Sequence, residues 1–128
     1  MAERIRLLLV EDNQVFREAL ELLLGLRHDV EVIASVDTGN AAAEIVGDLR
    51  PDVVLMDYRL PGMNGAEATR AILAACPGAA VVCLTASVSR REVDELLEAG
   101  AVACLTKDEQ LDEIIAAIQR AAGHENAA

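Results

Sequence analysis

The chain has 128 residues, the common size of one domain with one hydrophobic core. Hydrophobic residues make up 53% of it, but with one Tyr, one Phe and no Trp the core must be built from Leu, Val, Ile and Ala. The net charge of −11 argues against direct nucleic-acid binding, because phosphates repel an acidic surface. No apolar run approaches the ~20 residues of a spanning helix, so we expect no membrane segment and a cytoplasmic location.

Apolar runs and amphipathic segments alternate along the chain. Each apolar run is continuous rather than alternating, as is typical of strands buried on both faces. The runs cover residues 7–10, 32–34, 53–56, 80–84 and 102–105. They predict five strands.

The segments between these runs have helical spacing. The first carries Phe16, Leu20, Leu23 and Leu24 on one face, the second Ala42, Ile45, Val46 and Leu49, and the last Leu111, Ile114, Ile115 and Ile118. The third is predicted to start at Asn64 with Glu67 as its capping-box partner, and the fourth repeats that signature with Ser89 and Glu92.

Alternating buried strands and amphipathic helices predict an α/β domain with a parallel sheet and helices on both faces. We assign this domain to residues 1–122, and residues 123–128 to a polar tail or the start of a linker. The three cysteines show no CxxC spacing. Cys83 and Cys104 lie inside apolar runs and are interpreted as small core residues, with zinc or redox chemistry as the minor alternative.

Polar residues follow the apolar runs where the predicted strands end. Glu11 and Asp12 follow the first run, Asp57 the third, Thr85 the fourth, and Thr106-Lys107 the fifth. The carboxyl ends of parallel strands share one edge of a sheet, where ligands bind in open α/β folds. These side chains are therefore expected to converge.

Three carboxylates held together repel one another unless a cation intervenes. Oxygen ligands without His or Cys favour Mg²⁺, with Mn²⁺ as a substitute, over zinc. The alternative is that Glu11 and Asp12 only cap the first helix. Asp57 at an equivalent strand end, with a cation opposite, favours the metal site.

Lys107 is the only lysine in the chain. It follows an apolar strand, from which an ammonium group on a flexible stem could reach a phosphoryl oxygen. The alternative is that the single lysine stands there by chance.

These residues resemble a known family. Residues 52–65, with Asp57 after an apolar strand and Pro61-Gly62 beyond it, resemble the phosphoacceptor segment of bacterial response-regulator receiver domains. Residues 10–13, 84–86 and 105–108 resemble the other three signatures, in the expected order. Residues 67–70 and 105–108 look most like receivers attached to LuxR-type helix-turn-helix domains.

The resemblance implies a flavodoxin-like three-layer sandwich, with five helices and a five-stranded parallel sheet of order 2-1-3-4-5. It implies that Asp57 is the phosphoacceptor. It further implies that Asp12 and Asp57 coordinate Mg²⁺, with Glu11 acting through water and the Arg59 backbone carbonyl as another ligand.

The same resemblance implies that Thr85 and Lys107 hold the phosphoryl oxygens, and that small Ala86 leaves room for the group. The implied partner is a sensor histidine kinase, and the implied response is phosphorylation-dependent homodimerisation. Transcription would be controlled, and DNA contacted, only through an output domain beyond Ala128. The domain would be a signalling switch and not an enzyme acting on other substrates.

Two positions depart from the family pattern. Cys104 stands where receivers usually carry Tyr or Phe, an aromatic residue whose rotamer follows phosphorylation. Asp108 stands where many receivers carry a cis proline, so the geometry of the Lys107–Asp108 bond stays open.

Three alternatives remain. An aspartate-nucleophile phosphatase would need a second acid where Arg59 stands. A flavin-binding module would need free amides after the first strand, where Glu11 and Asp12 would repel a phosphate. A degenerate receiver that serves only as an interaction surface is the third, and Cys104 keeps it open.

Overall fold

The computed structural model describes residues 4–86 and 89–123, in which strands and helices alternate five times. The elements are β1 (Ile5–Val10), α1 (Gln14–Gly25), β2 (Val30–Val36), α2 (Gly39–Leu49), β3 (Val53–Met56), α3 (Gly65–Ala75), β4 (Ala80–Thr85), α4 (Arg90–Ala99), β5 (Ala103–Thr106) and α5 (Leu111–Ala121). The strands form one parallel sheet of order β2-β1-β3-β4-β5. The predicted fold is confirmed.

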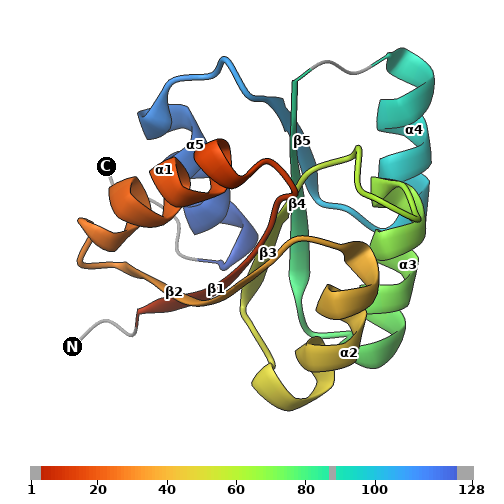
Figure 1. Cartoon of the computed structure of the whole chain (residues 1–128), viewed down its shortest axis with the longest axis horizontal. Coiled ribbons are helices and arrows are strands. Elements are labelled where there is room, and N and C mark those ends of the chain that lie inside the picture. The colour runs from red at the N-terminus through yellow and green to blue at the C-terminus, as the bar shows by residue number, and fades with distance from the viewer. Residues whose placement is uncertain (1–3, 87–88, 124–128) are drawn as a thin grey trace.

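The helices cover the two faces of the sheet. α1 and α5 lie on one face, and α2, α3 and α4 lie on the other, so that the sheet is the middle of three layers (Figure 1). Each face has its own apolar core. Leu20 and Leu24 of α1 and Ile118 of α5 pack on one side, while Val46 of α2 and Leu96 of α4 pack on the other.

Burial differs between central and edge strands. β1, β3 and β4 are almost entirely buried, in agreement with their continuous apolar runs. β2 and β5 are edge strands and only partly buried, so the prediction of burial on both faces is wrong for them. Cys104 on β5 is therefore half-buried, whereas Cys83 on β4 is inaccessible. Leu23, expected in the core, has 40% of its surface exposed.

The helix starts agree with the predicted caps. Asn64 and Glu67 form a capping box at α3, and Ser89 and Glu92 form one at α4. α1 is capped by the side chain of Asn13, which accepts the Phe16 N–H. Glu11 and Asp12 do not cap this helix, which leaves their carboxylates for the sheet edge. None of the described helices combines the length and apolarity of a bilayer-spanning segment.

Candidate functional site

The sheet register brings the polar strand ends together. Val10 pairs with Met56, so Glu11 and Asp57 leave neighbouring strands at the same level, and the Asp57 N–H donates to the Val10 carbonyl at 3.0 Å. On the other side the Lys107 N–H donates to the Thr85 carbonyl at 2.7 Å. The predicted convergence of these strand ends is confirmed.

Three carboxylates form a cluster at this edge. One oxygen from each of Glu11, Asp12 and Asp57 lies within 4.8 Å of the others. Glu11 and Asp57 are buried, whereas Asp12 is exposed at the mouth of the cluster. Clustered carboxylate oxygens suit a hard divalent cation such as Mg²⁺ and offer nothing to a thiophilic metal.

The two oxygens of Glu11 already have partners. Oε1 lies 2.8 Å from Lys107 Nζ, and Oε2 accepts the Asn13 N–H at 3.0 Å. Burial raises the pKa of Glu11, and the nearby Asp57 carboxylate adds to this, while the bonds to Lys107 and Asn13 oppose it. A carboxylate engaged in this way is better suited to an outer-shell contact than to direct coordination of a cation.

Lys107 lies among the acids. Its Nζ is 3.1 Å from Asp57 Oδ2 as well as 2.8 Å from Glu11 Oε1. Burial by itself would lower the pKa of Lys107, but Glu11 and Asp57 together raise it above its usual value, so the ammonium group stays charged. No peptide bond of the described residues is cis, so the Lys107–Asp108 bond is trans.

Phe16 is a neighbour of this lysine that the sequence did not reveal. Lys107 Nζ lies 4.5 Å from the centre of the Phe16 ring, a cation–π distance. In the sequence Phe16 appeared only as part of the apolar face of the first helix. Helical periodicity assigns a residue to a face and says nothing of a cation that arrives from a distant strand.

Thr85 presents a hydroxyl with an unused hydrogen-bonding capacity. Its side chain is fully buried, and its Oγ1 has no hydrogen-bond partner among the described residues. Buried polar groups without partners are rare and mark places where a ligand or water completes the bonding. Ala86, which follows, is exposed. Ser87, two residues after Thr85, lies outside the described residues.

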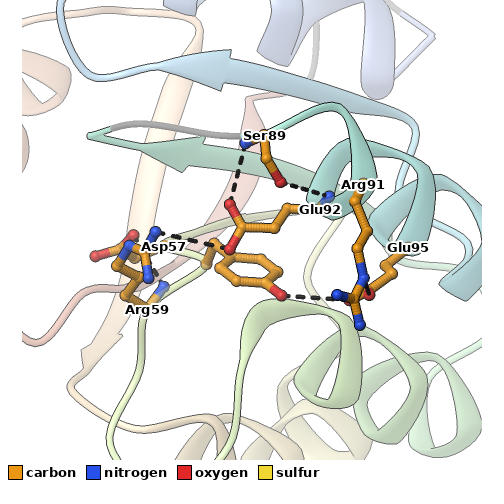
Figure 2. Close-up of polar contacts among 7 residues, drawn as sticks. Asp57, Arg59, Ser89, Arg91, Glu92 and Glu95 are labelled. Atoms are coloured by element: carbon orange, nitrogen blue, oxygen red, sulfur yellow. Dashed lines mark hydrogen bonds and ion pairs between the residues drawn. The ribbon is translucent and has the colours of Figure 1, made fainter.

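The loop after Asp57 is connected to α4 through Arg59. The Arg59 N–H donates to Asp57 Oδ1 at 3.3 Å, and one guanidinium nitrogen lies 3.6 Å from Glu92 Oε2. The other oxygen of Glu92 accepts the Ser89 N–H at 3.1 Å in the capping box (Figure 2). Glu92 thus serves both the cap of α4 and the arginine beside Asp57, a second role that its capping-box spacing did not indicate.

A second connection to α4 runs through Tyr58. Its hydroxyl donates to Glu95 Oε2 at 3.3 Å, and Arg91 Nε donates to Glu95 Oε1 at 3.1 Å (Figure 2). Burial and the Glu95 and Glu92 carboxylates raise the pKa of Tyr58, so the hydroxyl keeps its proton as donor. Two successive residues after Asp57 therefore contact one helix.

The sequence model of the response regulator receiver domain matches residues 7–119. This chain belongs to that family. The receiver domain is 39% identical over 114 residues to the transcriptional regulatory protein LnrK of Bacillus subtilis, covering 89% of this chain and 52% of LnrK. It is 34% identical over 116 residues to the transcriptional regulatory protein DegU of Brevibacillus brevis, covering 91% and 49%. The receiver domain thus spans about half the length of the curated relatives that it matches.

Solved structures agree with this assignment. The signal receiver domain of NarL from Mycobacterium tuberculosis superposes with a TM-score of 0.89 at 34% identity, covering 94% of this chain and 98% of that one. A LuxR-family two-component response regulator from Aurantimonas superposes with a TM-score of 0.89 at 29% identity, covering 98% and 90%. The resemblance to receivers of the LuxR family is confirmed.

Proposed function

We propose that this receiver domain is a phosphorylation-activated switch in which Asp57 accepts a phosphoryl group from a sensor histidine kinase. The observation that carries the proposal is the position of Asp57. Its buried carboxylate belongs to the acidic cluster and lies 3.1 Å from Nζ of the only lysine. Thr85, at the end of the next strand in the sheet, has a buried hydroxyl with no partner among the described residues. A nucleophile, a place for a cation and two groups for phosphoryl oxygens are the parts that phosphoryl transfer needs.

The acidic cluster is proposed to hold Mg²⁺, for which Mn²⁺ can substitute. Asp12 and Asp57 would be direct ligands together with the Arg59 carbonyl, and Glu11 would act through water. The full use of both Glu11 oxygens by Lys107 and Asn13 supports this division. A bound divalent cation supplies neutralisation of the charge on the phosphoryl oxygens.

The chain's own groups account for the rest of the transfer. An Asp57 oxygen forms a bond to phosphorus while the bond from phosphorus to the donor breaks, and the donor takes the electron pair. Lys107, already 3.1 Å from Asp57 Oδ2, can pair with a phosphoryl oxygen, and the Thr85 hydroxyl can donate to another. The domain would catalyse only its own phosphorylation and dephosphorylation, so we expect no turnover of small phosphate esters.

Phosphorylation is expected at one residue. Incubation with acetyl phosphate and Mg²⁺ should add one phosphoryl group to the wild type, measured by intact mass, and none to Asp57→Asn or in the presence of EDTA. Asp52→Asn is the matched control, because Asp52 precedes the same strand at the opposite end and contacts Arg6. An adduct of unchanged yield in Asp57→Asn would show that the acceptor lies elsewhere.

In our proposal, the output domain that controls transcription is not part of this sequence. Residues 1–122 would form the receiver, and residues 123–128 would begin a linker to an effector domain that contacts DNA in the cytoplasm. The relatives named as transcriptional regulatory proteins, about twice as long, support this arrangement. The mass of the protein isolated from its own cells tests the idea, since a native chain ending near Ala128 would contradict it.

Arg59 is proposed to control the lifetime of the phosphoryl group. Its side chain is 62% exposed, and its only ion pair among the described residues is with Glu92. Arg59→Ala should therefore cost less than about 1 kcal/mol of folding stability. The same change removes a cation two residues from the phosphoacceptor. It should alter the half-life of the aspartyl phosphate by about threefold or more, which corresponds to roughly 0.7 kcal/mol in the activation free energy of hydrolysis. Decay curves identical to those of the wild type would exclude such a role, and Arg91→Ala is the control.

Phosphorylation is also proposed to cause dimerisation through the surface of α4, β5 and α5. Leu97 of α4 and Val102, the residue before β5, are 48% and 55% exposed, which supports an apolar contact between two copies. Because Cys104 has no ring to rotate, the signal would pass from Thr85 to the start of α4.

Sedimentation with and without beryllofluoride tests this route. The wild type and Cys104→Ala should dimerise with beryllofluoride, whereas Thr85→Ala and Leu97→Glu should stay monomeric. Leu22→Glu, at an exposed apolar position on α1, is the control and should dimerise. A response lost in Cys104→Ala and kept in Thr85→Ala would overturn the route.

A further inference from the structure

Cys83 and Cys104 lie directly beside each other on neighbouring strands. They are register partners in the parallel β4–β5 pair. Cys83 belongs to the core under α2, α3 and α4, and Cys104 packs against that same core, so both side chains are on one face of the sheet. Neighbouring strands run about 4.8 Å apart. Disulfide-bonded cysteines have Cα atoms about 4.4–6.8 Å apart, so this pair meets the distance requirement.

The two thiols differ in access and acidity. Cys83 is fully buried, whereas Cys104 is half-buried on an edge strand. The neighbouring Cys104 thiol, together with burial, raises the pKa of Cys83. The same contact with Cys83 lowers the pKa of Cys104. An accessible, more acidic thiol beside a buried one is the arrangement of a thiol that reacts first and a thiol that resolves the product.

We propose that Cys83 and Cys104 form a reversible disulfide in response to a peroxide, and that this bond regulates the phosphoacceptor site. The interpretation as a small core residue fits Cys83, whereas Cys104 packs against the core from an edge strand and is only partly buried.

The reaction balances in two steps. The Cys104 sulfur attacks one peroxide oxygen, an S–O bond forms and the O–O bond breaks. The departing oxygen takes up a proton and leaves as water or an alcohol. The Cys83 sulfur then attacks the Cys104 sulfur, an S–S bond forms, and the S–O bond breaks as the hydroxyl leaves with the Cys83 proton as water. Two thiols are oxidised by two electrons, and the peroxide is reduced by two.

The position of Cys83 and Cys104 predicts how a disulfide between them would affect the phosphoacceptor site. Cys83 is two residues before Thr85, Cys104 is three before Lys107, and the Lys107 N–H donates to the Thr85 carbonyl at 2.7 Å. Side chains in direct parallel register stand about 4.8 Å apart, whereas bridged Cβ atoms lie about 3.8 Å apart. The bond must therefore draw β4 and β5 together just behind these two residues, and its strain makes it easy to reduce.

Thiol counting tests the bond independently of phosphorylation. The folded protein is treated with hydrogen peroxide, then denatured and alkylated with N-ethylmaleimide for intact mass. The wild type should fall from three adducts to one, and Cys76→Ala from two to none, with reversal by dithiothreitol in both. Cys83→Ala and Cys104→Ala should form no intramolecular disulfide.

Three results of the thiol count would contradict the proposed disulfide. The first is three free thiols in peroxide-treated wild type, and the second is conversion of Cys104 to sulfinic acid without loss of the Cys83 thiol. The third is a disulfide that links two chains. Cys76→Ala keeps both cysteines of the pair and leaves β4 and β5 unchanged. Its thiol count therefore tests the disulfide even if Cys83→Ala or Cys104→Ala fails to fold.

The proposed regulation of the phosphoacceptor site by the disulfide rests on the proposed phosphoacceptor function and needs its own measurement. Oxidised wild type should react with acetyl phosphate and Mg²⁺ about tenfold more slowly than reduced wild type, because small displacements of positioning groups cost that much or more. Dithiothreitol should restore the rate, and Cys104→Ala should be insensitive to peroxide. Equal rates for both forms would overturn the regulation. A reduced protein that takes no phosphoryl group would overturn the proposed function and leave the thiol count standing.

Discussion

Asp12→Ala is expected to weaken Mg²⁺ binding by about 100-fold or more, and Glu11→Ala by only about tenfold, since outer-shell contacts contribute less than direct ligands. Asp12 is exposed and close to the other two carboxylates, with its oxygens open to a cation. Glu11 is buried with both oxygens engaged. Titration calorimetry measures both affinities. Reversed effects would show that the two roles are exchanged, and equal effects would contradict the proposed difference between them.

The free energy of unfolding should rank the same two variants in the opposite order, with Glu11→Ala as the more damaging change. Asp12→Ala removes one of three repelling charges from the surface and should leave the free energy of unfolding unchanged or slightly higher. Glu11→Ala removes the acceptor for Lys107 and for the Asn13 N–H and should cost about 1–3 kcal/mol. Glu11→Gln, which keeps an acceptor oxygen, is the matched control. Urea unfolding without metal gives these values.

Lys107→Met is expected to destabilise the metal-free protein by about 3 kcal/mol. The lysine is the cation between two carboxylates that are only 3% and 7% exposed, so its loss leaves adjacent buried charges uncompensated. Added Mg²⁺ should recover much of that loss, and therefore stabilise the variant more than it stabilises the wild type. The measurement is the urea midpoint with and without Mg²⁺.

Lys107→Arg separates charge from shape in this experiment. It keeps a cation near Glu11 and Asp57 but replaces a compact ammonium with a planar fork, so part of the stability should return while phosphoryl transfer stays impaired. If Lys107→Met unfolds at the wild-type urea concentration without metal, the lysine does not hold the acidic cluster together.

The residues of the proposed site lie together despite the two departures from the family pattern. Lys107 reaches Asp57 and Glu11 across a trans bond to Asp108, so no cis proline is needed to place it. With Cys104 at the usual aromatic position, Thr85 is buried, and its hydroxyl has no partner in the part of the chain that the structure describes. This geometry does not favour the hypothesis that the chain is a degenerate receiver. The direct test is whether acetyl phosphate phosphorylates the wild type but not Asp57→Asn.

Local sequence determined the elements and the composition of the site. Continuous apolar runs determined the strands, apolar spacing the helices, and the Asn64–Glu67 and Ser89–Glu92 pairs the starts of two helices. These signals are readable because they depend on neighbours a few residues away. The parallel arrangement then required that polar residues after the strands share an edge, which was enough to name Asp57 and Lys107.

Only the tertiary structure decided which role each of those residues can have. Glu11 and Asp12 are adjacent in sequence and both follow β1. Glu11 is nevertheless buried against Lys107, the residue after β5, whereas Asp12 is exposed. Edge and central strands have similar apolar runs, and only the sheet order exposes Cys104 and buries Cys83. Contacts across a sheet depend on register and strand order, and periodicity within one segment carries information on neither.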